Sequence, residues 1–469
     1  MAKEEYRTEK DTLGQVKVPA AAYWGAQTQR AVENFPISGL RAHPALIRAM
    51  VCVKAAAARA NAGLGKLDKK LAKAIEEACR EVLGGKLLDQ WVVDVYQAGA
   101  GTSFNMNTNE VIANRANEIL GLPLGAYKPV HPNDHVNMSQ STNDTFPTAM
   151  QVAALMQGAA VAEAAECLAD ALAATGQAFD AVIKSGRTHL QDAVPVRLGQ
   201  EFMAWSLAVH RGAERLLAAL EECKELPLGG SAAGTGLNTH PDYAAAAVEQ
   251  LSEIADLELV PAEDLRQAMQ SMAPIGAASA ALRALALELI RISSDIRLLA
   301  SGPRTGLAEI RLPAVQPGSS IMPGKVNPSL AECLGMAAMQ VVGNDTAVAL
   351  AVQAGQLELN VFMPLMAHNV LSSMEILANA MTAFTVRCVR GIEADEERCR
   401  AYFESSVGLA TILNEHIGYA KAAEVAKESV KTGKTLRELI LEKGLMSKAE
   451  LNKALDPKRV TEPHGPKHE

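Results

Sequence analysis

The sequence predicts a mostly α-helical protein built on a central bundle of long helices. Three observations support this fold class. Hydrophobic residues make up 49% of the 469 positions but aromatic residues only 4%, and alanine recurs along the whole chain. Alanine favours helices, whereas aromatic and β-branched residues favour strands. Long apolar patterns with helical spacing fill the middle of the chain, and strand signals are few.

Length and local composition divide the chain into three predicted domains. A chain of 469 residues exceeds the usual size of one domain, which is roughly 100–150 residues. Residues 1–144 are predicted to form an N-terminal domain, residues 145–395 a central helical bundle domain, and residues 396–469 a small C-terminal domain of short charged helices. The polar tail from Asp456 onward is expected to be disordered.

Charge and cysteine usage argue against several partner classes. The formal net charge is −8 and no tract is rich in Lys and Arg, so nucleic acid is not an expected partner. The charged N-terminus lacks a signal peptide, and no uninterrupted apolar run reaches the ~18 residues of a membrane span. Seven scattered cysteines without a CxxC motif indicate reduced thiols. We expect a cytoplasmic protein without a membrane partner.

The N-terminal domain is predicted to hold helices over residues 45–62 and 67–84, followed by the glycine-rich segment GAGTSFNMN at 99–107. A glycine-rich turn that leads into a helix offers free backbone N–H groups and the positive end of the helix dipole. Both suit a carboxylate or a phosphate. The alternative is a simple helix cap formed by Thr102 or Ser103.

A second polar segment reads HPNDHVN at 131–137 and continues as SQSTND at 139–144. Its two histidines, His131 and His135, suggest a metal ion, but Pro132 between them argues against the helix that would align them. We therefore expect no metal. The dense neutral side chains indicate an array of hydrogen-bond donors, and a buried loop that satisfies its own backbone is the alternative.

The central domain is predicted to contain long helices with coiled-coil-like apolar spacing. The clearest covers residues 278–300, and a second runs from Leu198 to Leu220. A third is expected to begin at Thr145, because a hydroxyl cap followed closely by Pro147 suits a first turn. Alanine-rich helices with broad apolar stripes favour a homo-oligomer that continues the bundle across subunits.

Two further polar segments lie in the central domain. GRTHLQD at 186–192 contains His189, which on its own is more typical of a structural histidine than of a catalytic one. PGSSIMPGKVNP at 317–328 looks like a phosphate-binding loop. However, five residues rather than four separate its two glycines, and Val326 replaces the hydroxyl residue that would hold magnesium. Fixed prolines together with methionine and lysine also argue against a flexible linker.

Together, the four segments describe a site with many neutral donors, one lysine and one histidine. They contain no paired catalytic carboxylates and no set of metal ligands, so we expect neither cofactor nor metal. Such a site suits a small dicarboxylate and a carbanion whose charge spreads onto a carboxylate. The expected chemistry is proton abstraction next to a carboxylate, followed by loss of a leaving group.

The loop GSSIMPGKVNP at 318–328 resembles the signature of the fumarase/aspartase superfamily. The other three segments are similar to that superfamily in order and spacing, and the likeness runs from about Tyr6 to Pro457. The resemblance implies a mostly α, three-domain fold in which five long helices per chain form the twenty-helix core of a homotetramer. It also implies active sites that are each assembled from three subunits.

The resemblance further implies roles for individual residues. Ser319 matches the loop serine that acts as the general base on the C3 proton, and His189 is the other catalytic candidate. The matched substrate-binding positions are Thr102, Ser103, Ser141, Thr142, Asn143, Thr188, Ser320, Lys325 and Asn327. Glu332 matches an acidic partner of the histidine. A serine is a weak base, so its loop is expected to close and to lower the pKa of the hydroxyl with nearby donors and positive charge.

Two activities within the superfamily compete. Features that resemble aspartases are GAGTSFNMN, where fumarases usually show GSGTQ, QSTND in place of QSSND, DAVP at 192–195 and AGQLELN at 354–360. Features that resemble class II fumarases are YWGAQTQR at 23–30, HPNDHVN, LGGSAAGTGLNTH at 228–240 and NVFMP at 360–364. The first set lies at or beside substrate positions, so we predict elimination of ammonia from L-aspartate, with hydration of fumarate as the alternative. A non-catalytic scaffold is disfavoured because the candidate catalytic set is complete.

Overall fold

The computed structural model describes residues 5–463, and their contacts group the chain into two compact units. Unit 1 comprises Met1–Ala162, Glu214–Ala286 and Met339–Leu377. Unit 2 comprises Glu163–Ala213, Leu287–Ala338 and Ala378–Glu469. The predicted mostly α fold class is confirmed. The division at residues 144 and 395 stays a prediction, because the two units are assembled from separate stretches of chain.

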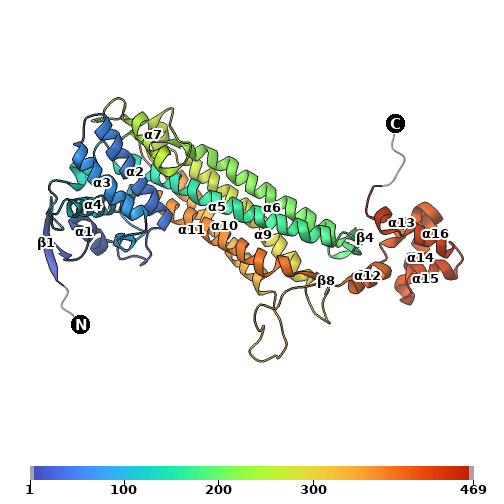
Figure 1. Cartoon of the computed structure of the whole chain (residues 1–469). Helices are drawn as coiled ribbons and strands as arrows, with labels where there is room; N and C mark the ends of the chain where they lie inside the picture. The colour runs from blue at the N-terminus through green and yellow to red at the C-terminus, as the bar shows by residue number, and fades with distance from the viewer. Residues whose placement is uncertain (1–4, 464–469) are drawn as a thin grey trace. The chain divides into compact units, whose positions relative to one another are not determined.

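Five long helices provide the frame, and each contributes one part to either unit (Figure 1). They are α5 (Thr142–Ala178), α6 (Leu198–Glu221), α9 (Ala273–Leu299), α10 (Ser329–Gln353) and α11 (Met363–Arg387). The helices that the sequence predicts over 278–300 and from Leu198 to Leu220 are therefore confirmed as α9 and α6.

The start of α5 differs from the prediction. The helix begins at Thr142, so Thr145 is not its cap and the proline that follows lies inside the helix. Ser141 Oγ accepts the backbone N–H of Asn143 at 3.2 Å, and Asp144 accepts the N–H of Ser141 at 2.9 Å. Ser141 thus caps one N–H of the first turn, and Asp144 binds the N–H of Ser141 itself. The capping hydroxyl at the start of α5 is therefore that of Ser141, four residues before Thr145.

Short elements surround the long helices of unit 1. The predicted helices over 45–62 and 67–84 are confirmed as α2 (Pro44–Gly63) and α3 (Lys69–Leu83). The remaining elements are the antiparallel hairpin β1 (Tyr6–Asp11) and β2 (Gly14–Pro19), α1 (Ala26–Asn34), α4 (Thr102–Ile119) and α7 (Tyr243–Ala255). Asp68 caps α3 by accepting the N–H groups of Lys70 and Leu71, as expected for an N-terminal aspartate.

Small residues let the long helices pack closely within each unit. In unit 1, a Cβ added at Gly158 on α5 would lie 2.2 Å from Leu220 Cδ1 at the end of α6. Also in unit 1, Ser279 on α9 donates a hydrogen bond of 2.6 Å to Asp345 on α10. In unit 2, a Cβ added at Gly176 on α5 would lie 2.9 Å from Met203 Cγ on α6. The alanine-rich composition thus reflects narrow spacing between helices.

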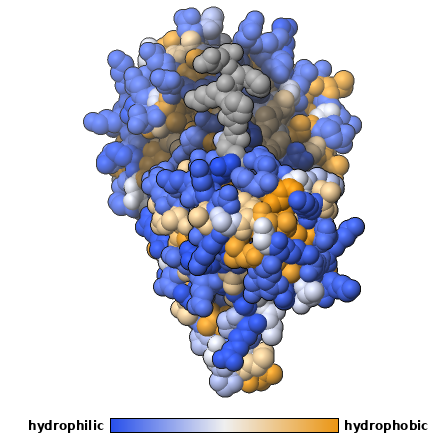
Figure 2. All heavy atoms as spheres, turned by 90° about the vertical axis from the view of Figure 1, so that its right-hand side faces the viewer, coloured by the Kyte–Doolittle hydropathy of each residue, from blue (hydrophilic) through white to orange (hydrophobic). Residues whose placement is uncertain are grey.

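Unit 2 ends in short helices packed around their own apolar cluster. They are α12 (Glu396–Ser405), α13 (Leu409–Ile417), α14 (Tyr419–Thr432), α15 (Leu436–Glu442), α16 (Lys448–Ala454) and α17 (Pro457–Val460). Figure 2 shows the face that carries these helices, which is mostly hydrophilic with hydrophobic side chains scattered over it.

The tail from Asp456 is more ordered than the sequence predicts. Residues Pro457–Val460 form α17, and Asp456 caps this helix through the N–H of Arg459. Arg197 then donates hydrogen bonds of 2.6 Å to Thr461 and 2.9 Å to Glu462. The prediction of disorder is wrong for this stretch because these contacts are long-range. Residues 464–469 lie outside the described part of the chain.

Three helices, α5, α9 and α10, are long and apolar enough to cross a membrane by length and composition alone, which the sequence analysis did not anticipate. Within the chain, only 39% of the apolar window of α9 and 28% of that of α10 is buried. Large apolar side chains on these two helices remain exposed, namely Leu287, Leu298, Met336, Met339 and Leu350. Within one chain these faces are apolar and uncovered.

Candidate active site

The predicted site residues are divided between the two units. Unit 1 holds Thr102, Ser103, Ser141, Thr142 and Asn143. Unit 2 holds Thr188, His189, Ser319, Ser320, Lys325, Asn327 and Glu332. Each group is built on its own local framework.

The glycine-rich segment of unit 1 turns sharply into α4. Gly101 has a φ of +83°, and an added Cβ would lie 2.1 Å from the ring of Phe146, so only glycine fits there. Gly101 is also the residue that precedes α4 and has no side chain to cap it, and the N–H of Phe104 in the first turn donates instead to Gln97 Oε1 at 2.8 Å. The interpretation of Thr102 or Ser103 as a helix cap is therefore wrong. The hydroxyl of Thr102 is exposed and makes one long bond of 3.3 Å to the carbonyl of Gly99.

Thr102 and Ser103 line a cavity of about 280 Å³ in unit 1. Its other walls come from the β1–β2 turn, from α1 and from α4: Asp11, Thr12, Leu13, Gln27, Arg30, Ala31, Asn34, Phe35 and Met106. Arg30 is held by Asp11, with Nε–Oδ2 and Nη2–Oδ1 distances of 2.7 and 3.1 Å. Among residues 5–463, no hydrogen bond engages the hydroxyl of Ser103, which leaves it available to a ligand.

The starts of α4 and α5 are joined by a side-chain hydrogen bond. Asn105 Nδ2 donates to Thr142 Oγ1 at 3.0 Å, and both side chains are buried. Each helix start presents a positive dipole end, although the side chains of Gln97 and Ser141 each accept one N–H of the first turn. Two segments that are far apart in the sequence are thus combined into one region suited to a carboxylate.

Beneath these helix starts lies Lys54 of α2, which is fully buried. Its ammonium group donates to the side-chain oxygens of Asn105 at 2.6 Å, Gln140 at 2.8 Å and Asn137 at 3.1 Å. Burial lowers the pKa of Lys54 to about 7, while the negative charge of Asp144 opposes this shift. One side chain therefore ties together the polar segments 99–107, 131–137 and 139–144.

Lys54 is not among the residues predicted from the sequence, because it lies in the apolar pattern of a helix with no motif around it. One signal was present in the sequence. Lys54 is the one charged residue in the run VCVKAAAA at 51–58. A helix that is apolar on all sides there offers its side chain no polar surface. Lysine is almost never fully buried without partners, so such a position indicates a buried polar network.

Asp144 supports the same region from the other side and is also fully buried. It accepts the backbone N–H groups of Ser141 at 2.9 Å and of Gly229 and Ser231 at 3.1 Å each. Burial raises the pKa of Asp144 to about 6, against the lowering effect of these hydrogen bonds. Asn143 adds a bond of 2.9 Å to the carbonyl of Ala232, so the 229–232 segment braces the start of α5.

The histidine-containing segment forms a π-helical turn, Pro132–Val136, with the proline at its first position. Pro132 thus does not prevent a helical turn, contrary to the sequence interpretation, because a proline is tolerated at a helix start. His131 Nδ1 accepts the N–H groups of Asn133 and Asp134, and His135 Nδ1 accepts the N–H of His131 at 2.8 Å. Both histidines are therefore engaged in holding the turn.

In unit 2, His189 lies at the tip of the hairpin formed by β3 (Ile183–Thr188) and β4 (Gln191–Arg197). His189 and Leu190 form the two-residue turn, with φ values of +55° and +58°. These conformations match a type I′ turn, which normally takes asparagine and glycine. A strained turn of larger residues is a mark of functional sites. Thr188 and His189 are both exposed.

Buried charges hold this hairpin. Lys184 on β3 forms ion pairs of 2.6 Å with the fully buried Glu309 and 3.0 Å with Glu201. Arg187, one residue before Thr188, pairs with the same Glu309 at 2.9 Å. Removing one partner would leave a buried charge, so the network fixes the direction of the hairpin.

The serine-rich loop of unit 2 is closed at its base by two hydrogen bonds of 2.7 Å. The N–H of Gly318 donates to the carbonyl of Lys325, and Asn327 Nδ2 donates to the carbonyl of Gly318. Within the loop, Ser319 Oγ accepts the backbone N–H groups of Ile321 at 3.2 Å and Met322 at 3.0 Å. Two N–H donors on one hydroxyl oxygen favour its anionic form.

The side chains around this loop remain open. Ser320 and Lys325 are exposed, and Lys325 forms no ion pair with any residue that the structure describes. Glu332, in the first turn of α10, lies 4.0 Å from Arg297. The resemblance implies a histidine as the partner of Glu332. Within one chain, its charged neighbour is Arg297 instead.

Family models match most of the chain. A lyase family covers residues 14–343, and a family described as the fumarase C C-terminus covers residues 409–462. An aspartate ammonia-lyase of Bacillus subtilis is 47% identical over 460 residues, which cover 98% of this chain and 97% of the relative. A class II fumarate hydratase of Halobacterium salinarum is 51% identical over 461 residues, with the same coverage.

Solved structures give the same result. A fumarate lyase:delta crystallin of Brucella melitensis bound to cobalt has a TM-score of 0.95 and 49% identity, covering 98% of this chain and all of that one. A class II fumarase of Schistosoma mansoni has a TM-score of 0.94 and 36% identity at the same coverage. The relatives thus include both ammonia-lyases and hydratases.

Proposed function

The chain belongs to the lyase family that contains aspartate ammonia-lyases and class II fumarases, and we propose that it eliminates ammonia from L-aspartate to give fumarate. The observation that carries this proposal is the environment of Ser103. This small side chain lines the cavity beside Thr102, and its hydroxyl is free to accept a hydrogen bond from an ammonium group. Class II fumarases resemble this segment but usually show glutamine at that position.

The substrate would be held by the buried region of unit 1. The N-terminal ends of α4 and α5, with Lys54 behind them, supply the positive field that one carboxylate requires. Thr102, Ser141, Thr142 and Asn143 are proposed to bind this carboxylate and the leaving group. Lys325 and Asn327 are proposed to bind the other carboxylate.

The proposed reaction begins with Ser319 in its deprotonated form. Its oxygen takes the C3 proton, and the electron pair moves onto the adjacent carboxylate to give an aci-carboxylate. When this charge returns to form the C2–C3 double bond, the C2–N bond breaks and ammonia leaves. The two backbone N–H groups on Ser319 Oγ support its role as the base.

The exposed half of the site leads us to propose a homotetramer in which three subunits build each site. His189 and the Ser319 loop lie on open surface, and α9 and α10 carry uncovered apolar side chains. Further copies would cover both kinds of surface. In this arrangement Glu332 would meet the histidine of a different subunit, and the enzyme would be cytoplasmic.

Hydration of fumarate is the second candidate, favoured by the 51% identity with a class II fumarate hydratase. A side-by-side assay of L-aspartate and L-malate, followed by fumarate absorbance, separates the two. We expect fumarate from L-aspartate, suppression by high ammonia, and little turnover of L-malate, because a site built for one leaving group rejects another. Faster turnover of L-malate would overturn the ammonia-lyase proposal in favour of the hydratase.

A further inference from the structure

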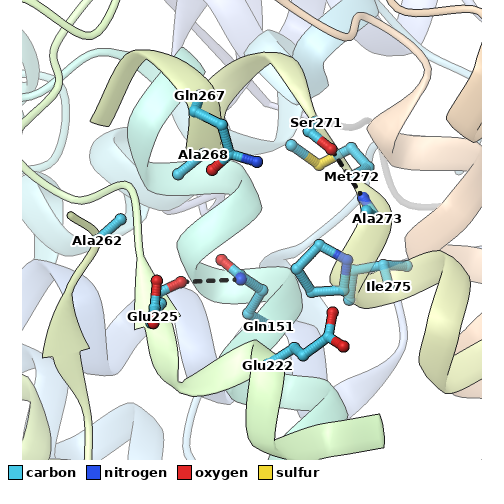
Figure 3. Close-up of a pocket in the computed structure, with 11 residues that line it drawn as sticks. Gln151, Glu222, Glu225, Ala262, Gln267, Ala268, Ser271, Met272, Ala273 and Ile275 are labelled. Atoms are coloured by element: carbon cyan, nitrogen blue, oxygen red, sulfur yellow. Dashed lines mark hydrogen bonds between the residues drawn. The ribbon is translucent and has the colours of Figure 1, made fainter. Parts of the chain in front are cut away.

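A second cavity, of about 200 Å³, lies in unit 1 and includes none of the predicted site residues. It is formed by α5, the segment after α6, α8 (Leu265–Gln270) and the first turn of α9 (Figure 3). Its lining residues are Gln151, Glu222, Glu225, Ala262, Gln267, Ala268, Ser271, Met272, Ala273, Pro274 and Ile275.

The cavity contains a buried acceptor without a donor. Gln151 is only 6% exposed, and its Nε2 donates to the backbone carbonyl of Glu225 at 3.1 Å. Because a carbonyl only accepts, this bond fixes which end of the amide is nitrogen. The Oε1 atom is then left, among the described residues, without a hydrogen-bond partner. Figure 3 shows Gln151 directed into the space between Glu225 and the α8 residues.

Two glutamates line the same cavity. Glu222 and Glu225 are exposed and make no ion pair with any residue in the range 5–463. Their charges repel an anion, so a dicarboxylate substrate does not suit this cavity. Carboxylates that form no ion pair instead attract a group that is positive and donates hydrogen bonds.

The rest of the wall is apolar. Aliphatic or thioether surface of the cavity comes from Ala262, Ala268, Met272 and Ile275. A bare inorganic cation would leave this surface unused, and no group of three metal-ligating side chains occurs among the described residues. An alkyl chain attached to a charged nitrogen uses both surfaces.

We propose that this cavity is an accessory binding site for a small primary amine with a short alkyl chain. Its ammonium group donates to Gln151 Oε1 and is balanced by Glu222 and Glu225. The alkyl chain packs against the apolar wall formed by α8 and the start of α9. The site is independent of the proposed reaction, since neither its residues nor its ligand take part in it.

The direct test is ligand-observed NMR titration of the full-length protein with n-butylamine, which is a cation at neutral pH. n-Butanol is the neutral control of the same length. We expect saturable binding of n-butylamine and none of n-butanol. Equal binding of the two, or no binding of the amine, would overturn the proposal. So would displacement of the amine by an equal concentration of magnesium chloride, which would indicate a metal site.

Variants locate the binding. Glu222→Gln and Glu225→Gln each remove one charge from an exposed position and are expected to weaken n-butylamine binding about fivefold or more. Gln151→Leu removes the buried acceptor and is expected to abolish it. Glu249→Gln, an exposed change of the same charge on α7, is the matched control and should leave the affinity unchanged. Wild-type affinity in both cavity glutamate variants would show that the amine binds elsewhere.

Discussion

The two units hold their shares of the candidate site in different ways. In unit 1 the polar segments are buried and bonded to one another through Lys54, Asn105 and Asp144. In unit 2 the candidates lie on the exposed tip of a hairpin and on an exposed loop, and only the bases of these elements are fixed. The residues proposed to bind one carboxylate are joined by hydrogen bonds within unit 1. The residues proposed for proton transfer and for the other carboxylate lie on exposed elements of unit 2.

Because of this difference, substitutions in the two units should have different effects on binding, stability and catalysis. Changes in the unit 1 network should affect binding and stability together, because the same hydrogen bonds do both. Changes at the exposed unit 2 residues should affect catalysis with little effect on folding, because few core contacts depend on them.

The largest effect is expected for Ser319→Ala. Turnover should fall by about three orders of magnitude or more, because the base is lost, while the thermal midpoint changes little. Steady-state kinetics and a melting curve measure both quantities. Ser294→Ala, which removes an exposed hydroxyl from α9 in the same unit, is the control. Turnover near the wild-type level in the Ser319 variant would remove this residue from the mechanism.

A smaller effect is expected for Lys54→Met, which keeps the shape of the side chain but removes its charge. Three amide oxygens lose their shared donor and the positive field at the helix starts weakens. We expect kcat/KM to fall about 10- to 100-fold, with a large share of the loss in KM. Lys70→Met, at an exposed position on α3, should behave like the wild type. An unchanged KM in the Lys54 variant would contradict the positioning role.

The same lysine predicts a pH dependence of stability. Its pKa is about 7 in the folded protein and has the ordinary value of 10.5 when unfolded. Between these values the unfolded chain binds more protons, so the free energy of unfolding should rise with pH. Relative to Lys54→Met, the wild type should gain up to ~1.4 kcal/mol per pH unit from about pH 7 to pH 10. Chemical denaturation at several pH values measures this, and parallel curves for the two proteins would refute it.

Sequence reasoning reached the fold because the helical signals are local. The spacing of leucine and isoleucine in α9 and the alanine content of α5 describe helices without reference to the rest of the chain. It failed at the start of α5, where Ser141 and Thr145 carry the same local signal and only the bonds of Ser141 to Asn143 and Asp144 distinguish them. It failed at the C-terminal tail, where Arg197 supplies a long-range contact.

Motifs in the sequence predict one part of the candidate site, and no motif in the sequence predicts the other part. The polar segments are visible as departures from the alanine-rich background. That Lys54 joins three of them is a property of the folded chain, because its partners lie 51 to 86 positions away. The strained turn at His189 is equally invisible, since its sequence does not contain the residues that such a turn prefers.

The central claim is that the exposed residues of unit 2 complete sites on other copies of the chain. It is tested most directly by refolding His189→Ala and Lys325→Ala proteins together in equal amounts. Each alone should be nearly inactive. In the mixture, random assembly should restore about a quarter of the wild-type activity, because each position is intact in half of the chains. Activity that stays at the level of the parents, in oligomers shown by native mass spectrometry to be mixed, would contradict the claim.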